Sequence, residues 1–252
     1  MAVHESTGAI RVLYRDESIV IIDKPPAMLT HSNSFDRHSP TVVMVLGSLL
    51  GQSIHNVHRL DRMTTGAMGL ARTPEAAREL SRQFREREVQ KRYLAVVRGH
   101  LDERGTVESP IRSDRDQEER EARTDYQTLG RGRVDQPIGK FEKAWFSLVA
   151  LELHTGRSHQ ARRHMHRISH PVIGDNKHGD KAYNRWAWNQ LGEKHLFLRA
   201  CELSFRHPGH GGEVRVRLAL PDIWLRLLET IGIAPPEELT REDIFATSPG
   251  EG

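Results

Sequence analysis

The first 90 residues alternate between apolar and polar positions in a way that predicts a β-hairpin followed by two helices. Two β-branched runs flank the polar stretch RDES within residues 10–24, and two adjacent prolines end the pattern. Residues 39–51 have helical spacing up to a terminal glycine. Residues 73–88 predict the clearest helix, because Thr73 is placed to cap it, a proline follows in its first turn, and apolar residues recur four apart.

The rest of the chain predicts several strands and two more helices. The strand-like runs cover residues 66–72, 91–99, 143–153, 200–206 and 213–219. One helix is expected to begin with Ser158 as its cap and to end before Pro171, and the other covers the amphipathic residues 221–232. The charged stretch 113–122 has few apolar anchors, so we expect an exposed, mobile connection there.

This order of elements predicts the α+β class. Strands and helices interleave with several hairpin-length gaps, so we expect a mixed, mainly antiparallel central sheet flanked by helices. We expect an N-terminal extension at 1–10, one main domain at 11–222, and a C-terminal helix with an acidic tail at 223–252.

Composition excludes several classes of protein. The longest apolar run, at 42–50, is far shorter than the roughly 18 residues of a membrane span, and the N-terminus lacks the pattern of a signal peptide. The single cysteine, Cys201, cannot form an internal disulfide or a thiolate zinc site, which fits a reducing compartment. We therefore expect a cytoplasmic protein that does not act at a membrane.

Charge is distributed unevenly along the chain, although the net charge is only +3. Residues 154–170 contain four arginines, five histidines and no acid, whereas residues 222–252 contain seven acids and two arginines. Such segregation allows one surface to attract phosphates. The alternative interpretation is a helix whose arginines are merely solvated.

The stretch HRLDRMTTG, at 58–66, places one carboxylate among cations. Asp61 lies two residues after Arg59 and directly before Arg62. A solvated surface ion pair is one interpretation. The other is a functional carboxylate kept ionised by its neighbours, because an opposite charge a few ångströms away lowers an Asp pKa by about 1–3 units.

Four ordered segments favour the second interpretation. They are KPPAMLTHS at 24–32, HRLDRMTTG at 58–66, QKRYLAVVRG at 90–99 and TGRSHQARRH at 155–164. Together they resemble the motifs of the pseudouridine synthases related to the bacterial enzymes that modify the large ribosomal subunit. The resemblance spans about residues 11–222, so it implies that this stretch is one catalytic domain, and a separate RNA-binding domain of the S4 type is not expected ahead of residue 10. It departs from the family pattern at Thr65, Ala161 and Arg199, where serine, a larger apolar residue and histidine are usual.

The resemblance implies an isomerase acting on RNA. The reaction breaks the C–N glycosidic bond of a uridine, turns the uracil, and joins its C5 to C1′ of the same ribose. It implies that Asp61 is the catalytic carboxylate, as nucleophile or base toward the sugar, and that Arg162 pairs with it. Arg59 would organise the loop and the flipped nucleotide. Tyr93 would stack beneath the base and take part in proton exchange at C5.

Substrate contacts are expected from residues in or beside the same motifs. The phosphate ligands we expect are Arg62, Lys91, Arg92, Arg157, Arg163 and Lys177. The other contacts expected are His58, Thr65, Gly66, His159, Gln160, Leu196 and Leu198, with one of the two leucines lining the uracil pocket.

Neither a cofactor nor a metal is expected. An isomerisation needs no external oxidant, reductant or group donor. His166 and His170 stand four apart, a spacing that binds zinc when an acid completes the set, but no acid lies in this stretch.

The segment KHGDKAYNR, at 177–185, predicts the kind of RNA. It resembles the members of the family that modify uridine 65 of tRNA, as does the insertion at 132–145. We therefore expect tRNA as the partner. A ribosomal RNA synthase of the same family is one alternative, and a non-catalytic RNA-binding or RNA-folding protein is another. Protein partners and the oligomeric state are not predicted.

Overall fold

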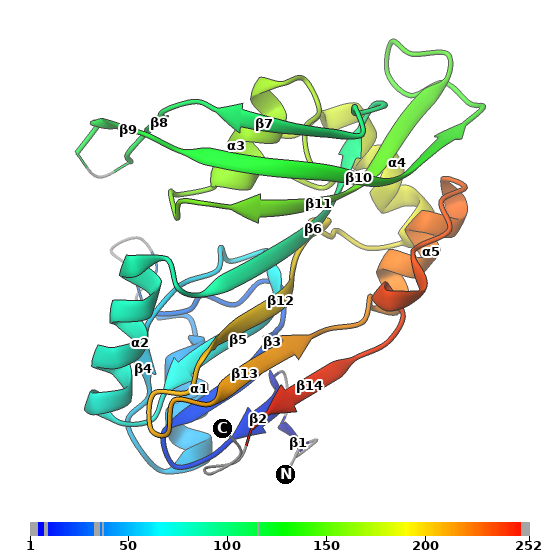
Figure 1. Ribbon diagram of the computed structural model, residues 1–252. Helices are drawn as coiled ribbons and strands as arrows, with labels where there is room; N and C mark the ends of the chain where they lie inside the picture. The colour runs from blue at the N-terminus through cyan, green and yellow to red at the C-terminus, as the bar shows by residue number, and fades with distance from the viewer. Residues whose placement is uncertain (1–4, 8–9, 33–35, 37, 115, 248–252) are drawn as a thin grey trace. The chain divides into compact units, whose positions relative to one another are not determined.

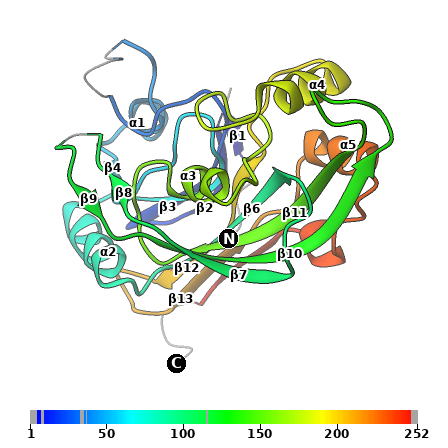
Figure 2. The same ribbon diagram turned by 90° about the horizontal axis from the view of Figure 1, so that it is seen from above.

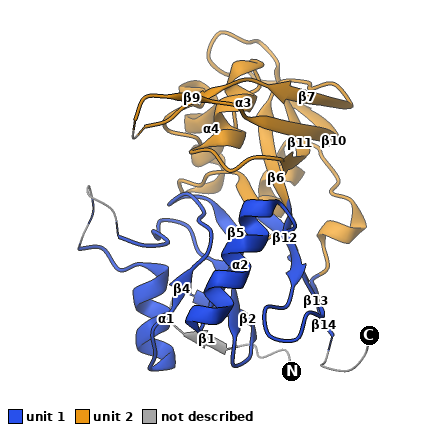
Figure 3. Cartoon of the chain, turned by 60° about the vertical axis from the view of Figure 1, so that its left-hand side comes forward, with its two compact units in different colours: residues 1–91, 200–218, 242–252 blue, residues 92–199, 219–241 orange. Residues whose placement is uncertain are grey.

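The computed structural model describes residues 5–7, 10–32, 36, 38–114 and 116–247 (Figure 1). The chain forms two compact units (Figure 3). Unit 1 comprises Met1–Lys91, Ala200–Leu218 and Glu242–Gly252, and unit 2 comprises Arg92–Arg199 and Ala219–Arg241. Each unit is therefore built from segments that are distant in the sequence.

Unit 1 is an antiparallel sheet with two helices. Its elements are β1 (Glu5–Thr7), β2 (Ile10–Arg15), β3 (Ile19–Lys24), α1 (Val42–Leu50), β4 (His55–Asn56), β5 (Thr65–Ala71), α2 (Pro74–Glu86), β13 (Glu213–Arg217) and β14 (Asp243–Ala246). Strand β3 pairs with β2 and β5, β1 pairs with β2, β4 pairs with β5, and β14 pairs with β13. Strand β12 (Leu198–Arg206), which pairs with β13, enters this unit at Ala200.

The hairpin and helix predictions for unit 1 are confirmed. Thr73 Oγ1 accepts a hydrogen bond from the Ala76 N–H at 3.2 Å, so it caps α2 as expected. Ala76 and Leu80 of that helix join a core cluster with residues of β2, β3, β5 and β13. The first four residues of β3 are apolar and fully buried, so both faces of the strand are covered there. Its last residue is a fully buried lysine.

Unit 2 contains antiparallel strands and helices. Its elements are β6 (Gln90–Arg98, in this unit from Arg92), β7 (Arg104–Glu108), β8 (Ile111–Arg112), β9 (Glu119–Arg120), β10 (Arg123–Val134), β11 (Ala144–Leu153), α3 (Gln160–Arg167), α4 (Lys181–Leu191), α5 (Asp222–Thr230) and the 3₁₀ helix η1 (Glu237–Leu239). Strand β11 pairs with β6 and β10, and β10 also pairs with β7. Helices α3 and α4 lie on the same side of this sheet (Figure 2).

Several elements of unit 2 were not predicted, and β10 is the longest of them. Its alternation is weak because its sequence has few apolar residues and two glycines. The glycines have a packing reason: a Cβ atom at Gly132 would lie 2.0 Å from the Ile231 carbonyl oxygen, and one at Gly130 would lie 2.7 Å from the Ile233 side chain. The two glycines lower the strand propensity of β10, but they allow the segment after α5 to approach the strand closely.

The α+β class is confirmed, and two local predictions need correction. The N-cap of α3 is His159 rather than Ser158, with a positive φ of 54° and no side-chain capping bond. The connection at 113–122 contains β9, which pairs with β8. The C-terminal segment contributes β14 to unit 1 and α5 to unit 2. The boundaries at 1–10, 11–222 and 223–252 stay a prediction.

None of the helices that the structure describes is long and apolar enough to cross a lipid bilayer.

Candidate active site

Asp61 lies in a loop of unit 1 between β4 and β5. Its carbonyl oxygen accepts a hydrogen bond from the Thr64 N–H at 3.0 Å, which closes a turn over residues 61–64. The residue before it, Leu60, is buried, and its carbonyl oxygen accepts a hydrogen bond from Thr30 Oγ1 at 3.3 Å. The loop is therefore anchored on both sides of Asp61 by contacts that do not involve its carboxylate.

Lys24 is the principal anchor of this loop, and sequence reasoning assigned it no role. Its side chain is fully buried, and its Nζ donates hydrogen bonds to the carbonyl oxygens of Pro25, Arg62 and Thr64 at 2.9, 3.0 and 2.9 Å. Burial lowers the pKa of Lys24 to about 8, although the negative charges of Asp61 and Asp23 oppose the shift. Lys24 thus fixes the backbone after Asp61 and places a positive charge near its carboxylate.

We expect Lys24→Met to lower both the rate and the stability. An apolar side chain leaves three carbonyl oxygens without their donor, and an unsatisfied buried polar group costs about 1–3 kcal/mol. The methionine variant no longer has the free-energy cost of burying an ammonium group, and this gain offsets part of the loss. We therefore expect the free energy of unfolding to fall by about 2 kcal/mol. We expect the single-turnover rate to fall by at least about tenfold as the loop loosens. Urea unfolding and single-turnover assays measure the two effects, with Lys194→Met, at an exposed lysine, as the control.

We expect the activity to fall at alkaline pH because of the same lysine. Three carbonyl acceptors require the three donors of an ammonium, and a neutral amine has two. Activity should therefore decline as pH rises through about 8, the pKa of Lys24. The folded pKa lies below the unfolded value, so this group's contribution to the free energy of unfolding rises between about pH 8 and 10.5. A decline caused by Lys24 thus occurs without unfolding, and a flat rate from pH 7 to 9 would contradict it.

The two arginines beside Asp61 differ in their surroundings. The side chain of Arg62 donates to Asp36 Oδ2 at 3.0 Å and to the Ala27 carbonyl oxygen at 3.1 Å, so it ties the loop to the 27–36 segment. Arg59 is exposed. The expected phosphate contact of Arg62 would have to compete with its ion pair to Asp36, whereas Arg59 is accessible to RNA.

His58, the first residue of the HRLD motif, holds the loop against its neighbours. Its Nε2 accepts a hydrogen bond from the Gly69 N–H at 3.1 Å, and its ring stacks on Phe84 with centroids 4.5 Å apart. Burial lowers the pKa of His58 to about 3, with a smaller effect of Lys91 in the same direction. A neutral ring is what an acceptor at Nε2 requires. These contacts give His58 a structural role.

Thr65 and Gly66 are buried at the start of β5. Gly66 has a positive φ of 114°, and a Cβ atom there would lie 2.1 Å from the Ala200 carbonyl oxygen. The glycine is thus required by the close approach of the backbone at Ala200. No side chain other than hydrogen fits at this position.

Tyr93 and its neighbours lie where β6 leaves unit 1. Tyr93 is buried and faces Leu151 of β11 across the strand pair in unit 2. Arg92 pairs in the same ladder with Glu152. Lys91, which belongs to unit 1, has its Nζ 5.7 Å from the centroid of the Phe84 ring, and burial lowers its pKa. Lys91 is therefore a partly sheltered cation, and its expected phosphate contact stays a prediction.

Arg162 is held in unit 2 by a buried carboxylate that sequence reasoning missed. Its Nε and Nη2 donate to the two oxygens of Asp175 at 2.8 and 2.7 Å, in a two-bond fork. Asp175 also accepts hydrogen bonds from the N–H groups of Lys177 and His178 at 2.9 and 3.0 Å. Burial alone would raise the pKa of Asp175, but these hydrogen bonds and the guanidinium lower it. Asp175 thus stays ionised and sets the orientation of Arg162.

The side chain of Gln160 stabilises the turn that precedes α3. Its Oε1 accepts hydrogen bonds from Thr155 Oγ1 at 2.6 Å and from the Arg157 N–H at 3.1 Å, and its Nε2 donates to the Arg123 carbonyl oxygen at 2.9 Å. The residue is buried, so these contacts give it a structural role. Arg157 Nε donates to the Glu121 carbonyl oxygen at 3.1 Å.

The remaining predicted residues of unit 2 divide into buried and accessible ones. Leu196 and Leu198 are both buried, so their exposure does not decide which would line a uracil pocket. Lys177 is exposed, and Arg163 and His159 are partly exposed. Within the described part of the chain, no group of three His, Cys, Asp or Glu side chains is arranged to hold a metal ion.

Comparison with known proteins decides the family. The model of the RNA pseudouridylate synthase family matches residues 18–167, more than half of the chain. This chain belongs to the RNA pseudouridylate synthase family. The match includes Asp61, Tyr93 and Arg162, and it ends at the last residue of α3.

Relatives within the RNA pseudouridylate synthase family match along nearly the whole chain. The chain is 37% identical to tRNA pseudouridine synthase C of Yersinia pestis, over 96% of its own length and 100% of that protein. It is 37% identical to the enzyme of the same name from Haemophilus influenzae, over 88% of its length and 98% of that protein. Human RNA pseudouridylate synthase domain containing 4 has a similar structure, with a TM-score of 0.70 and 25% identity, covering 90% of this chain and 94% of that one.

Proposed function

We propose that this RNA pseudouridylate synthase acts on tRNA and isomerises one uridine, at position 65. The observation that carries the proposal is the 37% identity to tRNA pseudouridine synthase C of Yersinia pestis over the full length of that protein. The position within tRNA rests on the resemblance of residues 177–185 to the enzymes that modify uridine 65. We place the reaction in the cytoplasm, where the single buried Cys201 stays reduced.

Residues 177–185 fall into two groups: some make structural contacts within unit 2, and others are exposed and accessible to RNA. Asp180 caps α4 and forms an ion pair with Arg98 at 2.6 Å. Asn184 accepts a hydrogen bond from the Gly174 N–H at 2.6 Å and donates one to the Asp175 carbonyl oxygen at 2.8 Å. Lys177 and Arg185 are exposed. Lys181 is exposed as well, so recognition of RNA by this segment falls to its three exposed cations, while Asn184 supports the backbone at Asp175.

In the reaction that we propose, the carboxylate of Asp61 acts on the sugar of the flipped uridine. The N1–C1′ bond breaks, the uracil turns within the site, and a C5–C1′ bond forms. C5 then loses its proton and N1 carries one, so the product is an isomer and no cofactor is consumed. Asp61 needs to be ionised, and the nearby positive charge of Lys24 favours that form. Arg162, whose guanidinium is oriented by Asp175, is the second catalytic group that we propose.

Mapping pseudouridine in total RNA tests the proposal directly. A strain that lacks the gene should lose pseudouridine at one tRNA position, and the wild-type gene should restore it. Loss of a ribosomal pseudouridine instead would replace the tRNA assignment with a ribosomal one. An unchanged pseudouridine map would favour a non-catalytic RNA-binding protein.

Two substitutions of Tyr93 separate stacking from proton exchange. If the ring only stacks on the base, Tyr93→Phe should bind and react nearly as the wild type does, while Tyr93→Leu loses roughly 1–3 kcal/mol of stacking. If the hydroxyl takes part in proton exchange, Tyr93→Phe should bind tRNA but release the C5 proton slowly. Tritium release from tRNA labelled at uridine C5, compared with the appearance of pseudouridine, distinguishes the two. Wild-type rates in Tyr93→Leu would remove both roles.

A further inference from the structure

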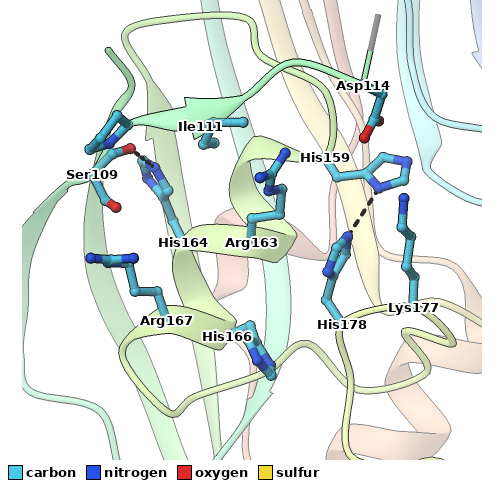
Figure 4. A pocket seen from close by; sticks show the side chains of 11 residues that line it. Ser109, Ile111, Asp114, His159, Arg163, His164, His166, Arg167, Lys177 and His178 are labelled. Carbon is cyan, nitrogen blue, oxygen red and sulfur yellow. Dashed lines mark hydrogen bonds between the residues drawn. The ribbon is translucent and has the colours of Figure 1, made fainter. Parts of the chain in front are cut away.

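Unit 2 contains a pocket of about 390 Å³ beside α3 (Figure 4). Three segments form it: residues 109–111 and Asp114 before, in and after β8, one side of α3 with the residue before it, and the turn that follows Asp175. Pro110 and the buried Ile111 give it an apolar wall. The Asp61 loop does not contribute to it, so the pocket is a feature of unit 2 alone.

The pocket is strongly cationic. Its lining includes the side chains of Arg163, Arg167 and Lys177, and among the described residues that line it Asp114 is the only carboxylate. Asp114 Oδ2 accepts a hydrogen bond from Ser158 Oγ at 3.3 Å. Within the part of the chain that the structure describes, Arg167 and Lys177 form no ion pair. An excess of accessible cations over a partly apolar wall is suited to a sugar–phosphate unit.

A hydrogen bond to the backbone positions Arg163 at this pocket, whereas the buried His164 beside it is part of the pocket wall. Arg163 Nη1 donates to the Arg112 carbonyl oxygen at 2.8 Å, which leaves its other nitrogens for an anion. His164 has both ring nitrogens occupied, by Thr124 Oγ1 at 2.9 Å and by the Ser109 carbonyl oxygen at 3.0 Å. It therefore fixes α3 to the neighbouring strands and does not contact a ligand.

Two more histidines that line the pocket are hydrogen-bonded to each other. His159 Nδ1 and His178 Nε2 are 3.1 Å apart, so one ring donates to the other (Figure 4). Burial lowers the pKa of His178 to about 4, and nearby cations contribute to the shift although Asp175 opposes it. His178 is thus neutral at physiological pH. The permanent charge of the pocket comes from its arginines and its lysine.

Hydrogen bonds to Asp175 connect the pocket to Arg162. The N–H groups of Lys177 and His178 donate to Asp175 Oδ1, and the same oxygen accepts from Arg162 Nη2 at 2.7 Å. Arg162 and Arg163 are adjacent in α3. An anion bound by Lys177 and Arg163 therefore has a fixed position relative to the guanidinium of Arg162.

We propose that this pocket binds a backbone phosphate of the tRNA near the isomerised uridine, through Arg163, Arg167 and Lys177. The inference rests on the proposed function and adds a second point of attachment to it. Side chains cannot read the deep groove of A-form RNA, so an enzyme of this kind depends on phosphate positions to align its substrate. Arg167 was not among the residues expected from sequence.

Matched charge neutralisations test the pocket. The variants are Arg167→Gln and Lys177→Gln, with Arg226→Gln as the control, because Arg226 is an exposed arginine of α5 in the same unit and lies outside the pocket. We expect each pocket variant to weaken tRNA binding about three- to tenfold and to reduce the log–log salt slope by something under about one. Fluorescence anisotropy at several salt concentrations measures both quantities. The control should match the wild type.

The outcomes separate this inference from the proposed function. If both pocket variants keep wild-type affinity and salt slope while the wild type forms pseudouridine in tRNA, the pocket does not bind phosphate and the function stands. An equal loss in Arg226→Gln would show a diffuse charge effect and would also overturn the pocket. If the wild type binds tRNA with the expected dependence on Arg167 and Lys177 but forms no pseudouridine, the proposed function fails and the pocket stands.

Discussion

We expect the Asp61→Asn enzyme to fold, to bind tRNA and to form no measurable pseudouridine. Asparagine has nearly the shape of aspartate, and Lys24 and Thr30 hold the loop through its backbone carbonyl oxygens. The amide lacks the ionised oxygen that the reaction needs as nucleophile or base. Loss of such a group costs several decades of rate in enzymes where it has been removed. Single-turnover formation of pseudouridine at saturating tRNA measures the effect.

A matched substitution shows whether the loss belongs to Asp61. Asp135→Asn changes an exposed aspartate that pairs only with Arg133 among the described residues, at 3.4 Å, and it should retain the wild-type rate. Residual turnover of Asp61→Asn above about 1% would count against Asp61 as the catalytic carboxylate. Loss of tRNA affinity in the same variant would indicate a binding role instead.

The fold was predictable where local pattern and tertiary structure agree. The hairpin of β2 and β3 and the capped helix α2 have strong local signals, and both formed as expected. Strand β10 was missed because its residues are set by contacts distant in sequence, such as that of Gly132 with Ile231. Strand β14 is short, and its pairing with β13 joins segments that the chain separates by about 30 residues. Such pairings leave little trace in a local pattern.

The candidate site was suggested by motifs, not by residue type alone. Asp61 and Arg162 were selected because their segments resemble family motifs, and their catalytic roles stay a prediction. Lys24 and Asp175 were missed because their importance lies in what they contact. A lysine that ends an apolar strand and an aspartate after a glycine are ordinary in sequence. Only their burial and their hydrogen bonds to the Asp61 loop and to Arg162 show what they do.

We expect Asp175→Asn to slow isomerisation about a hundredfold by releasing Arg162. The amide keeps one acceptor oxygen and turns an NH₂ toward a guanidinium, so the two-bond fork is lost. Breaking a buried pair in this way also costs about 3–5 kcal/mol of unfolding free energy. Asp175→Glu keeps the negative charge but displaces the oxygens from Arg162 Nε and Nη2. That variant should regain much of the stability and little of the rate, which a purely structural residue would not do.

A double-mutant cycle with Arg162→Lys shows whether Asp175 acts through Arg162. Lysine keeps the charge of Arg162 but has no fork to match the carboxylate, so we expect Arg162→Lys alone to lower the single-turnover rate by at least about a hundredfold. If Asp175 serves only to orient Arg162, adding Asp175→Asn to Arg162→Lys should change the rate little further, because the orientation is already lost. Rates are compared at saturating tRNA and at a temperature where all variants are folded by circular dichroism. Multiplicative losses would mean that Asp175 supports the reaction by a route other than Arg162, and a wild-type rate in Arg162→Lys would mean that its guanidinium is not needed.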